Sequence, residues 1–249
     1  MPLLPRLNMA SRAVAAAGAL LVLVSSSPVT AKTPPKPKKP VIPVNGLVAY
    51  WPGNGNAKDV AGHHDGNASA TLAYAPGKVG SSFKFDGNGA LVGIPFAPAF
   101  DLDPEGQFTI SAWVRPEGQG HYQAVLVKAA TRGKWEYGII IDPSGHFYSG
   151  RDANDVAQST TVIAPGVWYQ VAVTYDKGSI TTYVNGVAEA HADGVKIAQS
   201  PAGLCIGHKG ETSVPGEDPD WFQGQIDEVR LYNRTLSADE VKVIYDANK

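Results

Sequence analysis

The chain has 249 residues, and its 21 Lys and Arg against 23 Asp and Glu leave a formal net charge of −2 at pH 7. Six of the basic residues lie before Val41, where there is no acidic residue, so the rest of the chain carries 15 basic groups against 23 acidic groups and a net charge of −8. This balance argues against nucleic acid and polyanionic ligands, which bind basic surfaces. The single cysteine, Cys205, excludes an intramolecular disulfide.

The first 31 residues have the pattern of a secretory signal peptide. Arg6 and Arg12 precede an apolar run from residue 13 to residue 24, and Val29-Thr30-Ala31 is a plausible cleavage site. The alternative is a membrane anchor, but the run is much shorter than the roughly 20 residues of a spanning helix. We therefore expect no membrane span, a mature chain beginning near Lys32, and a location that is secreted, at the cell surface or periplasmic.

Residues 32–43 are rich in proline and lysine. Prolines at this density favour an extended polyproline II conformation, and repulsion between four lysines extends it further. The segment is therefore predicted to be a linker. Tethering to an anionic surface is the weaker alternative.

Strand patterns dominate residues 44–249, which we predict to be one all-β domain. Short runs rich in β-branched and aromatic residues alternate with Gly, Pro and Asn clusters. The clearest runs are 47–51, 82–87, 91–94, 108–115, 125–128, 137–141, 146–149, 168–175, 179–184 and 224–232. Asn185-Gly186 indicates a tight hairpin turn. The one convincing helix is the last element, which begins with a capping box at Ser237 and Glu240.

The last predicted strand carries an unusual carboxylate. Alternation would place Asp227 on the same face as Val229 and Leu231, and would place Glu228 and Arg230 on the other face. The first face is otherwise apolar and is expected to face the core. Because a buried carboxylate is costly without a compensating partner, Asp227 needs a hydrogen-bond donor, a cation or a metal.

The segment G-Q-I-D-E-V-R-L-Y-N-R-T-L-S, residues 224–237, resembles the closing signature of concanavalin A-like, laminin-G-like jelly-roll domains. Further matches follow in the family's order at residues 46–66, 80–87, 108–114, 165–176 and 183–186. The resemblance implies a two-sheet antiparallel jelly-roll sandwich with a short C-terminal helix. It also implies a structural calcium ion held by Asp59 and Asp227.

The residues themselves also favour calcium. The first and last strands of such a sandwich tend to be neighbours, so the loop that contains Asp59, His64 and Asp65 can reach Asp227. Carboxylate and backbone oxygens are the ligands that Ca²⁺ prefers. The predicted metal site therefore comprises Asp59, His64, Asp65 and Asp227. The alternative is that Asp59 caps a turn and Asp227 accepts loop amides, with no ion.

A second candidate site consists of aromatic and polar side chains on loops. The wider set is Tyr122, Trp135, Tyr137, Tyr148, Arg151, Asp152, Asn154 and Trp221. Flat aromatic faces and planar hydrogen-bonding groups suit neutral sugars, so we predict that Trp135, Tyr148, Arg151 and Trp221 bind ligand. The alternative is that each is an ordinary core or rim residue of a sandwich.

No catalytic constellation is evident. The sequence has neither an E-x-D-x-E strand nor a G-x-S-x-G elbow, and simple alternation points Asp227 and Glu228 to opposite faces. The leading hypothesis is a secreted, monomeric, non-catalytic module that binds carbohydrate or glycosylated surfaces and is stabilised by Ca²⁺. The alternatives are a structural or adhesion domain that makes protein contacts and, third, a polysaccharide-degrading enzyme.

Overall fold

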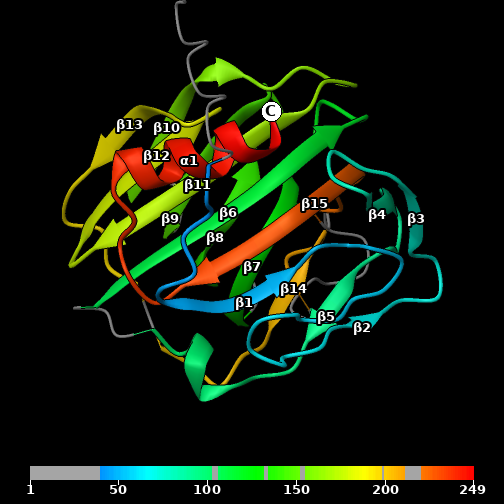
Figure 1. The fold of residues 1–249 in the computed structure, drawn as a ribbon, viewed down its shortest axis with the longest axis horizontal. Coiled ribbons are helices and arrows are strands. Elements are labelled where there is room, and N and C mark those ends of the chain that lie inside the picture. The colour runs from blue at the N-terminus through cyan, green and yellow to red at the C-terminus, as the bar shows by residue number, and fades with distance from the viewer. Residues whose placement is uncertain (1–39, 103–105, 132–133, 152–154, 198, 211–219) are drawn as a thin grey trace, which may run out of the picture. The chain divides into compact units, whose positions relative to one another are not determined.

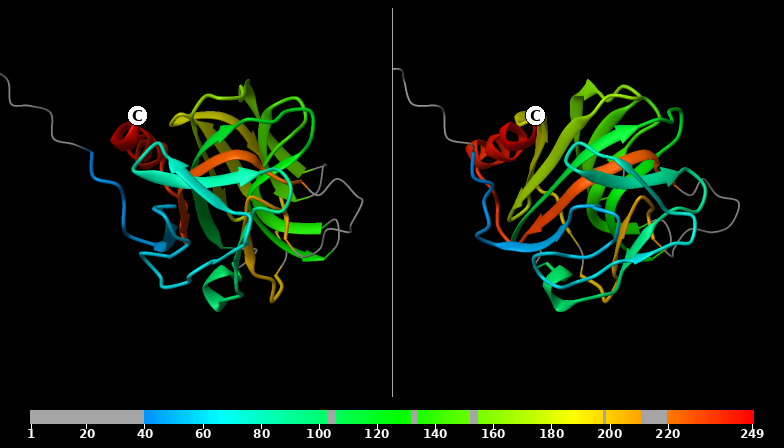
Figure 2. Two further views of the ribbon diagram at one scale, coloured as in Figure 1. Left: turned by 90° about the vertical axis from the view of Figure 1, so that its right-hand side faces the viewer. Right: turned by 45° about the vertical axis from the view of Figure 1, so that its right-hand side comes forward.

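The computed structural model describes residues 40–249 except 103–105, 132–133, 152–154, 198 and 211–219. The predicted signal peptide and most of the linker lie outside the described residues. These form a sandwich of two antiparallel sheets with one α-helix, α1 (Ala238–Asn248), on its outside (Figures 1 and 2). The arrangement confirms the predicted fold class. No helix in the described ranges is both long and apolar enough to cross a membrane.

The first sheet has eight strands. Its order is β13 (Val187–Ala192), β12 (Ser179–Val184), β11 (Tyr169–Asp176), β6 (Gln107–Pro116), β15 (Gln223–Tyr232), β4 (Ser81–Asp86) and β3 (Ala73–Pro76), and β1 (Leu47–Trp51) also pairs with β15. The second sheet has seven strands. Its order is β10 (Asp155–Val162), β9 (His146–Arg151), β8 (Lys134–Ile141), β7 (Gln123–Thr131), β14 (Leu204–Ile206), β5 (Val92–Ile94) and β2 (Asn67–Ala68). A short 3-10 helix, Pro98–Phe100, follows β5.

The core lies between the sheets and follows from alternation along the strands. In β6, Phe108, Ile110, Ala112 and Val114 belong to this core, whereas Trp113 does not. Partner strands contribute in the same way, because residues directly opposite each other share a face. The two inner faces therefore bury a continuous apolar layer.

The last strand breaks its alternation at a β-bulge. Asp227 lies opposite Trp113 and Arg230 lies opposite Ser111, so three steps on β15 span two steps on β6. Glu228 sits in the bulge with φ of 56°. One extra residue moves the side chains that follow to the other face.

The bulge overturns the predicted faces of β15. Ile226, Val229 and Leu231 enter the core, and Asp227 and Arg230 share the outer face with Tyr232. The prediction that Asp227 lies beside Val229 and Leu231 is therefore wrong. It assumed an unbroken strand, and the inserted residue removes that regularity.

The C-terminal helix covers part of this outer face. Its Val241 and Ile244 pack against Ala172, Tyr183 and Tyr232, which project from β11, β12 and β15. These contacts bury Val241 and Ile244 completely. They bring α1 next to the outer-face residues of β15 (Figure 1).

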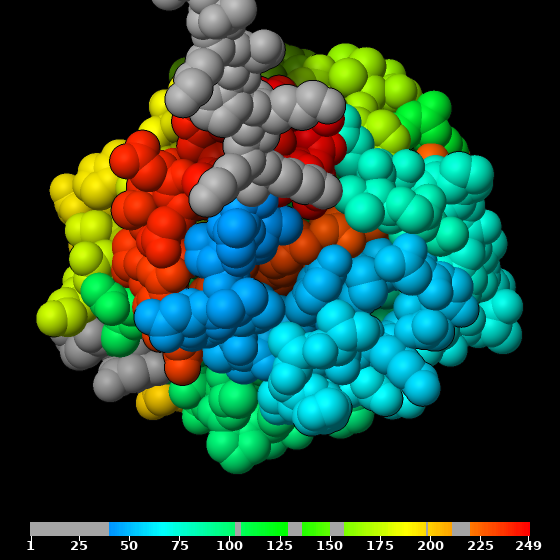
Figure 3. All heavy atoms as spheres, viewed as in Figure 1, coloured from blue at the N-terminus to red at the C-terminus, as the bar shows by residue number. Residues whose placement is uncertain are grey.

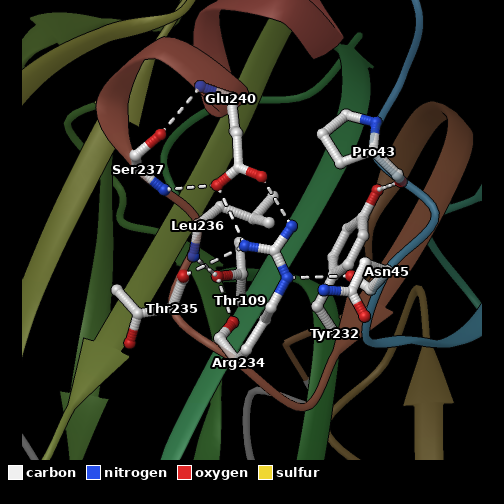
Figure 4. A network of polar contacts seen from close by, with 9 residues as sticks. All are labelled: Pro43, Asn45, Thr109, Tyr232, Arg234, Thr235, Leu236, Ser237 and Glu240. Atoms are coloured by element: carbon white, nitrogen blue, oxygen red, sulfur yellow. Dashed lines mark hydrogen bonds and ion pairs between the residues drawn. The ribbon is translucent and has the colours of Figure 1, made fainter.

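Polar contacts fix the start of α1 (Figure 4). The predicted capping box is present, since Ser237 accepts from the Glu240 amide and the Glu240 carboxylate accepts from the Ser237 amide. Arg234 forms two bonds with the Glu240 carboxylate, of 2.9 and 2.6 Å, and donates to the Asn45 carbonyl at 2.8 Å. The Arg234 guanidinium lowers the pKa of Glu240 to about 2. The network joins α1 to the chain before β1, which lies against β15 and α1 in Figure 3.

Candidate functional site

The carboxylate of Asp59 is held by its own loop. Its Oδ1 accepts from the amides of Tyr50 at 2.8 Å and Ala61 at 2.9 Å. Its Oδ2 accepts from the His64 amide at 2.9 Å and lies 3.0 Å from His64 Nδ1. The Gly62 amide is 3.1 Å from both oxygens. Burial alone would raise the pKa of Asp59, but these amide donors together hold it below its usual value.

The other predicted loop ligands complete this arrangement. Asp65 accepts from the Asp59 amide through Oδ1 at 2.9 Å, and the His64 carbonyl accepts from the Trp51 indole at 3.0 Å. Asp59, His64 and Asp65 are therefore brought together, as the sequence predicted. Their donors and acceptors serve one another and fix the turn after β1.

Asp227 lies in a different place. Both backbone polar groups of Tyr50 point towards the Asp59 loop, since its amide donates to Asp59 and its carbonyl accepts from Val60 at 2.9 Å. β1 therefore separates Asp59 from β15. The Asp227 carboxylate instead accepts from the Val79 amide through Oδ2 at 2.9 Å, in the loop between β3 and β4.

The described residues do not fit the predicted calcium ion. Ca²⁺ needs six to eight oxygen ligands, and both oxygens of Asp59 already accept hydrogen bonds from the loop's own donors. Within the described ranges, no three His, Cys, Asp or Glu side chains converge on a possible metal position. Asp59 thus follows the alternative interpretation, in which amides hold its carboxylate, whereas Asp227 accepts from a loop amide, that of Val79, through Oδ2.

Calcium dependence offers a direct check of this geometry. The measured quantity is the difference between the melting temperature in millimolar Ca²⁺ and that in EDTA. We expect this difference to be the same in Asp59→Asn, in Asp227→Asn and in wild type, because neither carboxylate is a calcium ligand. Differential scanning calorimetry measures this difference for each variant. A wild-type response that either substitution abolishes would restore the calcium site predicted from the sequence.

Beside Asp227 lies a buried ionic cluster on the outer face. The Glu228 carboxylate accepts from the Tyr50 hydroxyl at 2.6 Å and pairs with the Arg230 guanidinium. The guanidinium carbon lies 4.1 Å from the centre of the Tyr50 ring, and Asn248 of α1 donates to Glu228 at 3.4 Å. Arg230 is therefore engaged by Glu228 and Tyr50 rather than by Asp227.

This cluster changes the argument about catalysis. The bulge places Asp227 and Arg230 on one face and leaves Glu228 among outer-face contacts, so the predicted opposition of the two carboxylates is wrong. Both carboxylates are nevertheless buried. A polysaccharide chain cannot reach them without displacing their cover.

Aromatic side chains gather on the outside of the seven-stranded sheet. Tyr148 of β9 stands opposite Ile140 and packs on the small apolar cluster of Ala124, Val127 and Ile140. The Tyr122 ring meets the Tyr148 ring edge to face, with centroids 6.4 Å apart. Burial raises the pKa of Tyr148, and Tyr122, Asp220 and Asp142 raise it further. Tyr122, at 42% exposure, is the most accessible ring of the pair.

The backbone of Trp221 lies next to His121, the residue before Tyr122. The Trp221 ring stacks on His208 with centroids 3.8 Å apart, and the Trp221 carbonyl oxygen lies 3.3 Å from Nε2 of His121. The preceding residue, Asp220, accepts from the Ala124 amide through its carbonyl at 3.0 Å and pairs with Lys209 at 3.1 Å. We call Tyr122, Tyr148 and Trp221 the ring surface, and His208, which is 2% exposed, packs on Trp221 from within the protein.

The ring surface contains two of the four predicted ligand-binding residues. Tyr148 and Trp221 are present, and the side chains of Trp135 and Arg151 lie outside the described part of the chain. Tyr137, from the wider aromatic set, is buried in the core. The sequence did not single out His208, because its contact with Trp221 joins loop positions that no local pattern connects.

Comparisons with known proteins agree with this fold. The family model described as the concanavalin A-like lectin/glucanases superfamily, of laminin G type, matches residues 86–242. No curated protein matches the chain in sequence. Domain 4 of AbnA, an extracellular GH43 arabinanase from Geobacillus stearothermophilus solved with arabinotriose, is 24% identical with a TM-score of 0.64, over 82% of this chain and 98% of that domain.

Two further structures are similar over part of their length. The binding domain of Paraclostridial Mosquitocidal Protein 1 is 13% identical with a TM-score of 0.66, over 81% of this chain and 52% of that one. Trypanosoma rangeli sialidase in complex with the inhibitor DANA is 20% identical with a TM-score of 0.61, over 82% of this chain and 33% of the sialidase. The present chain thus spans about half of the first and a third of the second. At these identities the similarity concerns the fold.

Proposed function

Since this chain belongs to the concanavalin A-like lectin/glucanase superfamily, we propose that it is an exported, non-catalytic module that binds carbohydrate or glycosylated surfaces through the ring surface. The observation that carries the proposal is that Tyr122 packs against Tyr148 and that the backbone of Trp221 contacts His121 in the same loop before β7. Sugars present flat apolar C–H faces bordered by hydroxyl groups. Aromatic rings with one apolar face and a polar border suit them.

Polar groups border the rings. The Asp142 carboxylate accepts from Gln158 at 2.6 Å, and Gln158 stands opposite Tyr148. The Lys209–Asp220 ion pair lies next to Trp221. Amide, carboxylate and ammonium groups can each exchange a present partner for a sugar hydroxyl, which gives the surface both donors and acceptors.

Two further parts of the proposal rest on other grounds. Export rests on the signal-peptide pattern of residues 1–31. The similarity to an arabinanase domain solved with arabinotriose supports carbohydrate as the class of ligand, and it does not identify the sugar. Stabilisation by calcium is not part of the proposal, because the contacts of Asp59 and Asp227 do not fit the ion.

Binding to a glycan array followed by isothermal titration calorimetry tests the proposal. We expect Tyr122→Ala and Trp221→Ala each to weaken binding of the best array ligand at least tenfold, about 1.4 kcal/mol, because each removes a stacking face. Phe96→Ala is the matched control, since Phe96 is 41% exposed and Tyr122 is 42% exposed. It should bind as wild type does.

Three outcomes contradict the proposal. An array without any bound glycan would favour the adhesion alternative, and release of reducing ends from a polysaccharide would favour an enzyme. Equal loss of affinity in Tyr122→Ala and Phe96→Ala would move the binding site away from the ring surface.

A further inference from the structure

Two buried polar atoms on neighbouring strands make no hydrogen bond to any residue that the structure describes. They are Oδ1 of Asp227 and Nε1 of Trp113. Asp227 is 0% exposed and Trp113 is 2% exposed, and the two residues stand directly opposite each other on β15 and β6. Opposed residues share a face and have Cβ atoms about 4.5–5.5 Å apart. One atom is an acceptor and the other is a donor, yet they do not bond to each other.

The site is sealed on two sides. Tyr245 of α1 stacks on the Trp113 ring with centroids 5.7 Å apart. The ammonium of Lys78 lies 4.4 Å from the ring centre. The loop between β3 and β4 packs directly on the carboxylate, since a Cβ added to Gly77 would lie 2.6 Å from Oδ2 of Asp227. Bulk water therefore does not satisfy the two atoms.

The chemistry of the two atoms selects the occupant. An indole N–H only donates, so it needs an acceptor, which a metal cation cannot provide. A carboxylate oxygen accepts, so it needs a donor or a cation. A hydroxyl-bearing molecule meets both needs, because its oxygen accepts from the indole and its hydrogen bonds to the carboxylate. Buried waters commonly bridge groups of this kind.

We propose that Asp227 and Trp113 together bind one uncharged hydroxyl-bearing molecule, a water in the isolated protein, beneath the C-terminal turn of α1. The site is distinct from the ring surface, which lies on the other sheet. It gives Asp227 a partner in place of the metal ion that the sequence pattern suggested.

The charged neighbours are consistent with a neutral occupant. The titratable or charged groups around Asp227 are Glu228 and Arg230 of β15, Tyr50 of β1, Lys78 in the loop, and Tyr245 and Lys249 of α1. Arg230 is engaged by Glu228, and no ion pair joins Lys78 to Asp227 among the described side chains. Burial raises the pKa of Asp227 to about 7. The acid is therefore partly protonated near neutral pH.

Nuclear magnetic resonance of the ¹⁵N-labelled full chain tests the proposal. The Trp113 indole signal is assigned by its loss in Trp113→Phe. In a rotating-frame Overhauser experiment we expect a cross peak between this N–H and water. Its sign should be that of a dipolar contact and not that of chemical exchange. The Trp51 indole is the matched control, because it is equally buried and donates to the His64 carbonyl at 3.0 Å. It should show no such peak.

Two further measurements complete the test. The Trp113 indole shift should titrate with pH in wild type and remain constant in Asp227→Asn, and Ca²⁺ should leave it unchanged. A saturable Ca²⁺-dependent shift that Asp227→Asn removes would overturn the proposal in favour of a cation. Absence of the cross peak between the Trp113 indole N–H and water in the wild-type protein would also overturn the proposal. This measurement does not depend on whether Asp227→Asn folds.

Discussion

Replacing Lys128 with methionine is expected to lower the free energy of unfolding by about 3–5 kcal/mol, the range for removing one partner of a buried ion pair. The Lys128 ammonium donates to Glu136 at 2.6 Å, to Asp101 at 3.1 Å and to the Ser200 carbonyl at 2.8 Å. The side chains of Lys128 and Glu136 are 0% and 1% exposed. Among the described residues Oε1 of Glu136 has no hydrogen-bond partner, so the substitution would leave this carboxylate buried without its paired cation.

Two comparisons separate this effect from loss of a surface charge. Lys84→Met removes the partly exposed pair with Glu117 and should cost no more than about 1 kcal/mol. The double variant Lys128→Met/Glu136→Leu should recover much of the loss, because an apolar pair of similar size has no unpaired charge. Urea unfolding at pH 7 measures all three. Equal urea unfolding midpoints for Lys128→Met and Lys84→Met would contradict the prediction that the buried Lys128 ion pair contributes more stability than the partly exposed Lys84 pair.

The pH dependence of stability should carry a large contribution from Asp227. Its pKa is raised from 3.8 to about 7, chiefly by burial. Between these values the folded protein holds a proton that the unfolded chain has released, so stability falls as pH rises from about 4 to about 7 and levels off above that. At about 1.36 kcal/mol per pKa unit, the loss approaches about 4 kcal/mol.

Asp227→Asn should remove this contribution, because the amide does not ionise. The free energy of unfolding, measured in urea at intervals from pH 4 to pH 8, should fall more steeply in wild type than in the variant. Asp176→Asn, at an exposed position that ends β11, should follow the wild-type curve. Parallel curves for wild type and Asp227→Asn would show that Asp227 ionises in the folded protein as freely as in the unfolded chain.

The ring surface illustrates what local patterns leave out. The sequence identified Tyr148 and Trp221 as candidate ligand contacts from residue type and loop position. The position of Trp221 depends on contacts of the residues just after β14 and just before β15, where Trp221 stacks on His208 and Asp220 accepts from Ala124. These contacts join residues far apart in the chain, so no sequence window contains them.

The sequence by itself determined the strands and the C-terminal helix, because alternation, hairpin turns and the Ser237–Glu240 capping box are local. The two-sheet sandwich was implied by the family resemblance of residues 224–237. Only the tertiary structure decided the partners of Asp59 and Asp227. Glu228 occupies a bulge at the point where β15 changes its neighbour from β4 to β1. The extra residue is set by the registers of three strands. It turns Val229 and Leu231 into the core, while Asp227 lies on the outer face opposite Trp113. Whether a carboxylate bonds a cation, an amide or a water depends on which strands surround it, and that is a property of the assembled sheet.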